Sequence, residues 1–176
     1  MEWIHDNRNR FDKVIVCITD MGTNTNYSSF LKEKMDQDRI TFIDMPRAET
    51  GQDWRNEAIN KALEISKAEW VFFSEQDFFP LEGFWSEVEA LGQYSNVMGY
   101  FQDNRLHPCC ILMPRWIIEK TSKNFGVVKD ISDHFGLFQK EIEDLSYNHP
   151  ELEFPNDVRI GKLQNASHMN GLSQNL

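Results

Sequence analysis

Apolar residues in the first half of the chain form short runs, and the segments between them are longer and more polar. The runs at 13–19, 39–44 and 69–74 are rich in Val, Ile and Phe and are bounded by polar or turn residues, which predicts three strands. Helices are predicted over 28–35 and 53–67, and the second has apolar positions at a spacing near 3.6. Strand and helix therefore alternate, which favours an α/β fold with a mixed, mainly parallel sheet flanked by helices.

The second half of the chain has a less regular order of predicted elements. A hairpin-like link over 103–105 joins two of its strands, and Pro114 suits the start of a helix. The remaining segment, 153–176, is mixed and is expected to be loop-like. The predicted elements are a helix over 83–91, strands over 96–102 and 107–113, and helices over 114–120 and 133–145.

Length and composition indicate one globular domain over 1–176, without internal repeats or a low-complexity linker. The net charge is −10, from 18 Lys and Arg against 28 Asp and Glu. That balance argues against general binding to a phosphate backbone, although one cleft can differ in sign from the whole.

The cysteines and the N-terminal sequence indicate a cytoplasmic protein. The chain has three cysteines, two of them adjacent, and no C-x-x-C pair, which is typical of a reducing compartment. The first 13 residues lack the apolar core of a secretory signal, and no apolar run is long enough to span a bilayer.

Acidic residues stand at the ends of the three strands predicted in the first half. Thr19-Asp20, Asp44 and Glu75-Gln76-Asp77 would share one edge of a parallel sheet, which is where ligands bind in such folds. A carboxylate there can bind Mg²⁺ or Mn²⁺ together with substrate phosphates, and Asp77 is the strongest candidate. Spacing alone does not separate this site from an acidic pair that only ends a strand.

Several common catalytic and phosphate-binding motifs are absent from the sequence. Without G-x-x-x-x-G-K-[ST] or G-x-G-x-x-G, a P-loop or dinucleotide-binding fold has no basis. Without H-E-x-x-H or G-x-S-x-G, a zinc protease or a serine hydrolase has none either.

One stretch of the chain resembles the core of the GT-A nucleotide-sugar glycosyltransferases, especially their family-2-like group. The resemblance comprises Arg55-Asn56-Glu57-Ala58, Ala62 and the segment 68–77. In that family an Arg-Asn pair opens a helix, which leads to an apolar strand ending in Asp-x-Asp. Here the motif is Glu75-Gln76-Asp77, which departs at its first position. Weaker similarity continues at 107–120, 131–137 and 167–173.

The resemblance implies a metal-dependent enzyme that transfers a sugar from a nucleotide-diphospho-sugar to a hydroxyl acceptor. Asp77 and His168 would bind Mn²⁺ or Mg²⁺. Asp133, with Asp130 as the rival, would be the general base of an inverting transfer. The donor-binding residues would be Thr19, Asp20, Asp44, Arg55, Glu75 and Gln76.

The same resemblance divides the domain into functional halves. A nucleotide-sugar-binding half would span 13–102, and an acceptor half with a C-terminal metal and lid segment would span 103–176. Sugar rings pack on aromatic faces, so Phe78, Phe79 or Trp85 are candidates to shape the sugar pocket, although most of the aromatic residues around the motif are expected to belong to the core.

The acceptor and the reaction have alternatives. The acceptor would be a saccharide or a small molecule, or, as in compact bacteriophage enzymes, a hydroxymethylated DNA base, against which the net charge argues. A nucleotidyltransferase keeps the fold but usually has more glycine after the first strand than Gly22 alone. A catalytically degenerate nucleotide-binding or interaction domain is favoured by Glu75 at the first motif position.

Overall fold

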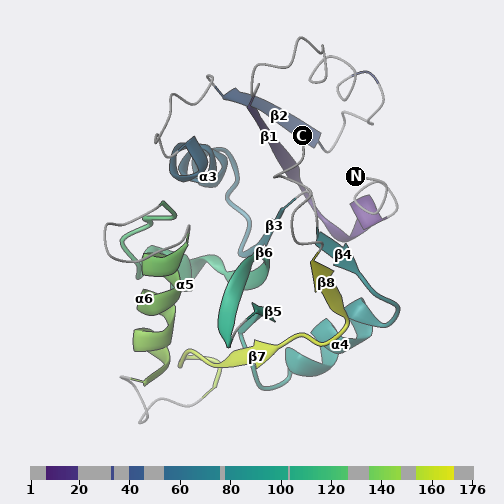
Figure 1. Cartoon of the computed structure of the whole chain (residues 1–176), viewed down its shortest axis with the longest axis vertical. Helices are drawn as coiled ribbons and strands as arrows, with labels where there is room; N and C mark the ends of the chain where they lie inside the picture. Colours follow the sequence, from purple (N-terminus) through teal and green to yellow (C-terminus); the bar gives the residue numbers. More distant parts are fainter. Residues whose placement is uncertain are drawn as a thin grey trace. The chain divides into compact units, whose positions relative to one another are not determined.

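The computed structural model describes residues 7–19, 33, 40–45, 54–75, 78–102, 104–126, 135–147 and 154–168 (Figure 1). The chain divides into two compact units, Met1–Ala68 and Glu69–Leu176, and each is described by itself. The boundary at 68/69 differs from the functional division expected at 102/103, and the single-domain organisation stays a prediction. In the part of the chain that is described, no helix is long and apolar enough to cross a membrane.

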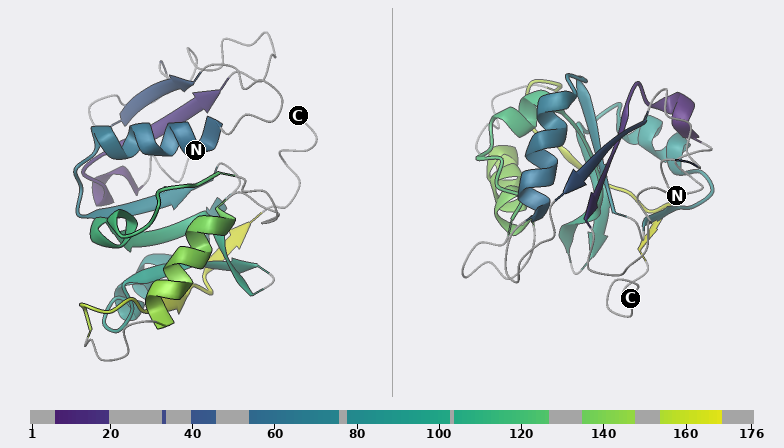
Figure 2. Two further views of the ribbon diagram at one scale, coloured as in Figure 1. Left: turned by 90° about the vertical axis from the view of Figure 1, so that its left-hand side faces the viewer. Right: turned by 90° about the horizontal axis from the view of Figure 1, so that it is seen from above.

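The first unit is built on two parallel strands and one helix. Strands β1 (Val14–Thr19) and β2 (Ile40–Met45) pair from Val14 opposite Ile40 to Thr19 opposite Met45. Helix α3 (Trp54–Ile65) lies along these strands (Figure 2). A short 3₁₀ helix, η1 (Arg8–Arg10), precedes β1.

The apolar residues of these elements form a small core of their own. Ile43 of β2 and Ala58 of α3 are buried, and Ile15, Cys17 and Ala62 pack against them. The strands predicted at 13–19 and 39–44 and the helix predicted at 53–67 are therefore confirmed. The helix predicted over 28–35 lies outside the described residues, apart from position 33.

The second unit contains a four-stranded mixed sheet in the order β3-β6-β5-β7. Its strands are β3 (Trp70–Ser74), β5 (Val97–Gln102), β6 (Arg105–Pro114) and β7 (Ile160–Lys162). β6 is antiparallel to both β3 and β5, and only β5 and β7 run parallel. A separate two-stranded antiparallel sheet joins β4 (Phe78–Pro80) to β8 (Ala166–His168).

The mixed α/β class is confirmed, but the expected mainly parallel sheet is not found. The link between β5 and β6 is too short for a crossover, so these strands can only form an antiparallel hairpin. Asn104 in that link adopts the left-handed conformation, with φ 61°, that tight turns require. The expected loop over 153–176 is also corrected, because β7 and β8 lie within it.

Strand β3 alternates between two apolar layers. On one face the Phe73 ring lies 5.7, 5.9 and 6.1 Å from the rings of Phe125, Phe135 and Phe138. Phe138 belongs to α6 (Gly136–Tyr147), whose buried side also includes Ile142. This aromatic cluster joins α6 to the sheet.

On the opposite face, Phe72 contacts a second aromatic cluster. Its ring centroid lies 5.9 Å from Phe78 of β4, and 6.3 and 6.4 Å from Phe84 and Trp85 of α4 (Phe84–Leu91). Helices α4 and α6 therefore cover opposite faces of the sheet, as Figures 1 and 2 show. The shorter α5 (Arg115–Glu119) follows β6 directly, and the three helices predicted in this half are confirmed.

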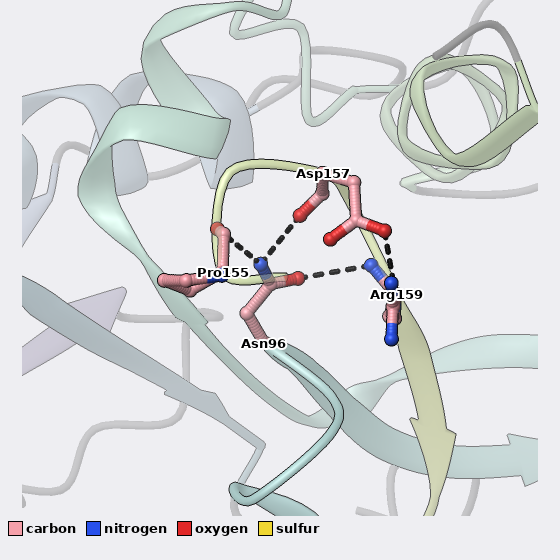
Figure 3. A network of polar contacts seen from close by, with 4 residues as sticks. All are labelled: Asn96, Pro155, Asp157 and Arg159. Carbon is pink, nitrogen blue, oxygen red and sulfur yellow. Dashed lines mark hydrogen bonds and ion pairs between the residues drawn. The ribbon is translucent and has the colours of Figure 1, made fainter. Parts of the chain in front are cut away.

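Asn96 fixes the segment that leads into β7 (Figure 3). The Asn96 side chain is 3 % exposed, and its Nδ2 donates to the carbonyl oxygens of Pro155 and Asp157 at 3.1 and 2.6 Å. Its Oδ1 accepts from the Arg159 N–H at 3.0 Å. The Arg159 Nε also pairs with Asp157 Oδ2 at 2.6 Å. Asn96 thereby satisfies three backbone groups just before β7 pairs with β5.

Replacing Asn96 by alanine is expected to lower the free energy of unfolding by about 2 to 4 kcal/mol. The substitution removes three hydrogen bonds made by a buried side chain and leaves the three backbone groups without these partners. Urea unfolding followed by tryptophan fluorescence measures the change. The control is Gln93→Ala, an exposed position nearby, which should change stability by less than about 0.5 kcal/mol. Equal stability of Asn96→Ala and wild type would contradict the role given to Asn96.

Candidate functional site

The β4–β8 ladder joins the acidic segment to the C-terminal histidine in the second unit. Phe78 lies opposite His168, Phe79 opposite Ser167 and Pro80 opposite Ala166. Residues directly opposite in an antiparallel pair have Cα atoms about 4.5 to 5.5 Å apart. The ladder therefore places the backbone of His168 opposite Phe78, the residue that follows Asp77 in the sequence.

Two backbone hydrogen bonds hold Glu75, one to β6 and one to the start of β4. The Glu75 N–H donates to the Cys109 carbonyl at 3.2 Å, which continues the pairing of β3 with β6. The Phe78 N–H donates to the Glu75 carbonyl at 3.3 Å and draws the ends of the acidic segment together. Glu75 is half-buried, while Gln76, Asp77 and the side chain of His168 lie outside the described residues.

The predicted donor-binding residues of the first unit follow its strands and helix. In the β1–β2 ladder Asp44 lies opposite Ile18 and Thr19 opposite Met45, so both carboxyl ends share one edge. Arg55 is half-buried in the first turn of α3. Asp20 and the side chains of Thr19 and Asp44 lie outside the described residues.

The predicted general bases, Asp130 and Asp133, also lie outside the described residues. The described part of α6 begins at Gly136, after Phe135 with φ 65°. The assignment of either aspartate as a base stays a prediction.

Among the aromatic residues proposed for a sugar pocket, Phe78 is placed in the core. It has no exposed surface, and its ring lies 5.6 Å from that of Phe84. Its prediction as a sugar contact is wrong, because successive side chains of β4 alternate and Phe78 is on the inner side. Phe79 is 40 % exposed, and Trp85 is half-buried.

Glu87 of α4 is a further residue tied to this part of the fold, and no motif in the sequence singles it out. Its Oε1 accepts from the Gln164 N–H at 2.7 Å and its Oε2 from the Asn165 N–H at 2.8 Å. Both amides belong to the link between β7 and β8. The partners are 77 and 78 positions away, so no local pattern identifies this contact.

The donor atoms offered by Asp77 and His168 suit a divalent cation. Carboxylate oxygen and neutral imidazole are accepted ligands of Mn²⁺, and substrate phosphates commonly complete such sites. Within the residue ranges given above, no three His, Cys, Asp or Glu side chains gather as a metal site. Asp77 and the side chain of His168 lie outside these ranges, so their assignment as metal ligands stays a prediction.

The cysteine thiols are poorly suited to act as nucleophiles. Cys109 and Cys110 are fully buried. Burial raises the pKa of Cys110 to about 12; a backbone hydrogen bond at Tyr100 opposes this shift and the charge of Glu87 adds to it. Burial also raises the pKa of Cys17, against the lowering effect of Lys61. Because the thiolate is the reactive form, the raised pKa values indicate that Cys17 and Cys110 are packing residues and not catalytic nucleophiles.

The comparisons with protein-family models and with curated proteins give no relative for the chain. No protein-family model matches it, and no curated protein matches it either. The arguments for function therefore depend on its residues and geometry.

Cys110 is expected to make stability fall at alkaline pH. Its pKa is about 12 in the folded protein and 9.0 for an unperturbed cysteine, so between these values the unfolded chain loses a proton that the folded chain keeps. Stability from the protonated thiol is therefore complete below pH 9.0 and falls as pH rises toward 12. Urea unfolding at several pH values should show a shallower decline for Cys110→Ser than for wild type. Identical slopes would contradict this.

Thiol alkylation checks the same burial directly. In native protein at mildly alkaline pH, iodoacetamide should leave Cys109 and Cys110 unmodified, while denaturing guanidinium chloride should expose all three cysteines. Peptide mass spectrometry identifies the labelled positions. Rapid native labelling of Cys109 or Cys110 would show that the thiols are accessible.

Proposed function

We propose that the protein is a cytoplasmic, metal-dependent glycosyltransferase that moves a sugar from a nucleotide-diphospho-sugar donor to a hydroxyl acceptor. The observation that supports this most is the β4–β8 ladder. It pairs His168 with the residue that follows Asp77, and these are the two metal ligands implied by the resemblance. The backbone of one implied ligand thus lies opposite the sequence neighbour of the other, although 91 positions separate 77 from 168 in the sequence.

The proposal includes a GT-A-like fold. The resemblance implies a helix opened by an Arg-Asn pair, then an apolar strand, then an acidic motif. Helix α3 carries Arg55 and Asn56 in its first turn, and β3 follows and leads into Glu75. The order of elements supports this assignment, although the second unit's sheet is mixed.

Each residue has a defined task in the proposed reaction. Asp77 and His168 hold Mn²⁺ or Mg²⁺, which neutralises the diphosphate leaving group and acts as a Lewis acid when bound. Asp44 accepts hydrogen bonds from the base or ribose, and Arg55 approaches the diphosphate. In an inverting transfer the acceptor oxygen bonds to the anomeric carbon as the bond to the diphosphate oxygen breaks, and Asp133 takes the hydroxyl proton.

Nucleotide binding with and without metal tests the proposal. The melting temperature should rise when a nucleoside diphosphate and Mn²⁺ are both present, and rise less with either alone, because ligands that bind the folded state stabilise it. The assay covers uridine, guanosine, adenosine and cytidine diphosphates. No stabilisation by any of them, with or without metal, would refute donor binding.

Product analysis separates glycosyl transfer from its alternatives. Release of nucleoside diphosphate from a nucleotide sugar supports glycosyl transfer, whereas pyrophosphate release from a nucleoside triphosphate indicates a nucleotidyltransferase. Metal-dependent binding without either product favours the non-catalytic nucleotide-binding domain.

Asp77→Ala is expected to weaken Mn²⁺-dependent nucleotide binding by at least about tenfold. Even loss of an outer-shell partner costs a metal site about 10- to 100-fold, and Asp77 is proposed as a direct ligand. Isothermal titration in the presence of Mn²⁺ measures the affinity. The matched control is Asp144→Ala, which removes an exposed carboxylate from α6. Both variants should still melt cooperatively, and unchanged binding in Asp77→Ala would remove the metal assignment.

A further inference from the structure

We propose that Glu87 is a positioning residue that holds β8, and with it the backbone of His168, beside the start of β4. This inference rests on the proposed function, since it names the residue that would keep His168 in place for the proposed metal site. Glu87 acts through the link between β7 and β8, and no direct contact with a ligand is invoked.

The Glu87 carboxylate uses both oxygens on consecutive backbone amides. Oε1 accepts from Gln164 and Oε2 from Asn165, at distances typical of charge-assisted hydrogen bonds. A fork of this kind fixes the position and the direction of the peptide between the two residues. Glu87 lies within α4, whose buried Phe84 and Val88 anchor the helix in the core.

A second contact on the same peptide segment comes from the chain that follows β4. The Leu81 N–H donates to the Asn165 carbonyl at 2.9 Å. Asn165 is thus bound through its N–H to α4 and through its carbonyl to the residue after β4. These contacts set the register in which Ala166 begins to pair with Pro80.

The β4–β8 ladder is too short to define its own position. It contains three residue pairs, and an isolated two-stranded pairing is only marginally stable in water. His168 is three residues beyond Asn165, at the far end of β8. An anchor at Asn165 therefore limits how far the backbone of His168 can move from Phe78. Strands β8 and β4 lie side by side in Figure 1.

The electrostatic character of the anchor makes it sensitive to a nearly isosteric change. In Glu87→Gln, one carboxylate oxygen becomes an NH₂ group, which cannot accept from a backbone N–H. One of the two amides then loses its partner, and the charge that strengthens both bonds is gone. The helix keeps its length and its apolar contacts.

Two measurements test the proposal on the whole chain. The first is hydrogen exchange of the amides in β8 without metal, which should be at least about tenfold faster in Glu87→Gln, because a charge-assisted hydrogen bond is lost. Exchange in the central β5–β6 hairpin should stay unchanged. The second is Mn²⁺ affinity by electron paramagnetic resonance with a nucleoside diphosphate present, which should fall about 10- to 100-fold. Glu82→Gln, an exposed carboxylate just before α4, is the matched control and should change neither.

Each outcome has a defined meaning. Unchanged β8 exchange in Glu87→Gln overturns the anchor, and faster exchange with unchanged Mn²⁺ affinity overturns its role at the metal site. Faster exchange in the β5–β6 hairpin as well would show that Glu87 stabilises the whole sheet, and this outcome also contradicts the proposal. If wild-type protein binds no Mn²⁺ with any nucleotide, the proposed function fails and the positioning role falls with it, while the exchange data still report the anchor separately.

Discussion

The antiparallel pairing of β3 with β6 is the constraint on which the second unit depends. It sets the two faces of β3, so that Phe72 and Phe73 enter different aromatic clusters. One cluster attaches α4 and β4, and the other attaches α6. The same pairing continues to Glu75 through the Cys109 carbonyl. The acidic segment therefore leaves the sheet at a point that the hydrophobic core determines.

Polar side chains bind the backbone near both ends of the last described segment, 154–168, whose Val158, Leu163 and Ala166 are buried. Asn96 binds the backbone at its beginning, and Glu87 binds it near its end. Between these two contacts β7 runs parallel to β5. Both side chains satisfy backbone groups that a regular ladder does not reach, as backbone amides and carbonyls away from water require. The path of the segment consequently depends on these hydrogen bonds as well as on the burial of its apolar side chains.

The sequence predicts the elements that bury an apolar face better than those held mainly by long-range hydrogen bonds. Strands β1, β2, β3, β5 and β6 and helices α3, α4, α5 and α6 follow apolar patterns and were predictable. Strands β7 and β8 have three residues each, too few for a periodic signal, so 153–176 reads as a loop. The prediction of a mainly parallel sheet was wrong, because the alternation of strands and helices along the chain does not specify which strands become neighbours. For the site, Asp77 is indicated by its place after a predicted strand and by the family resemblance, and His168 by the resemblance, whereas Glu87 needs the folded backbone to be found.

The long sequence separation between Glu87 and Asn165 has a consequence for the order in which the protein folds. Contacts between residues 78 positions apart close a large loop, and the entropy of that closure is lost before the contact is gained. The β3–β6 and β5–β6 pairings are nearer in sequence, so they are positioned to form earlier. The ladder containing His168 then docks on a sheet that already exists. A nascent chain that has not yet reached residue 168 can fold its central hairpin while it still lacks the strand that pairs with β4.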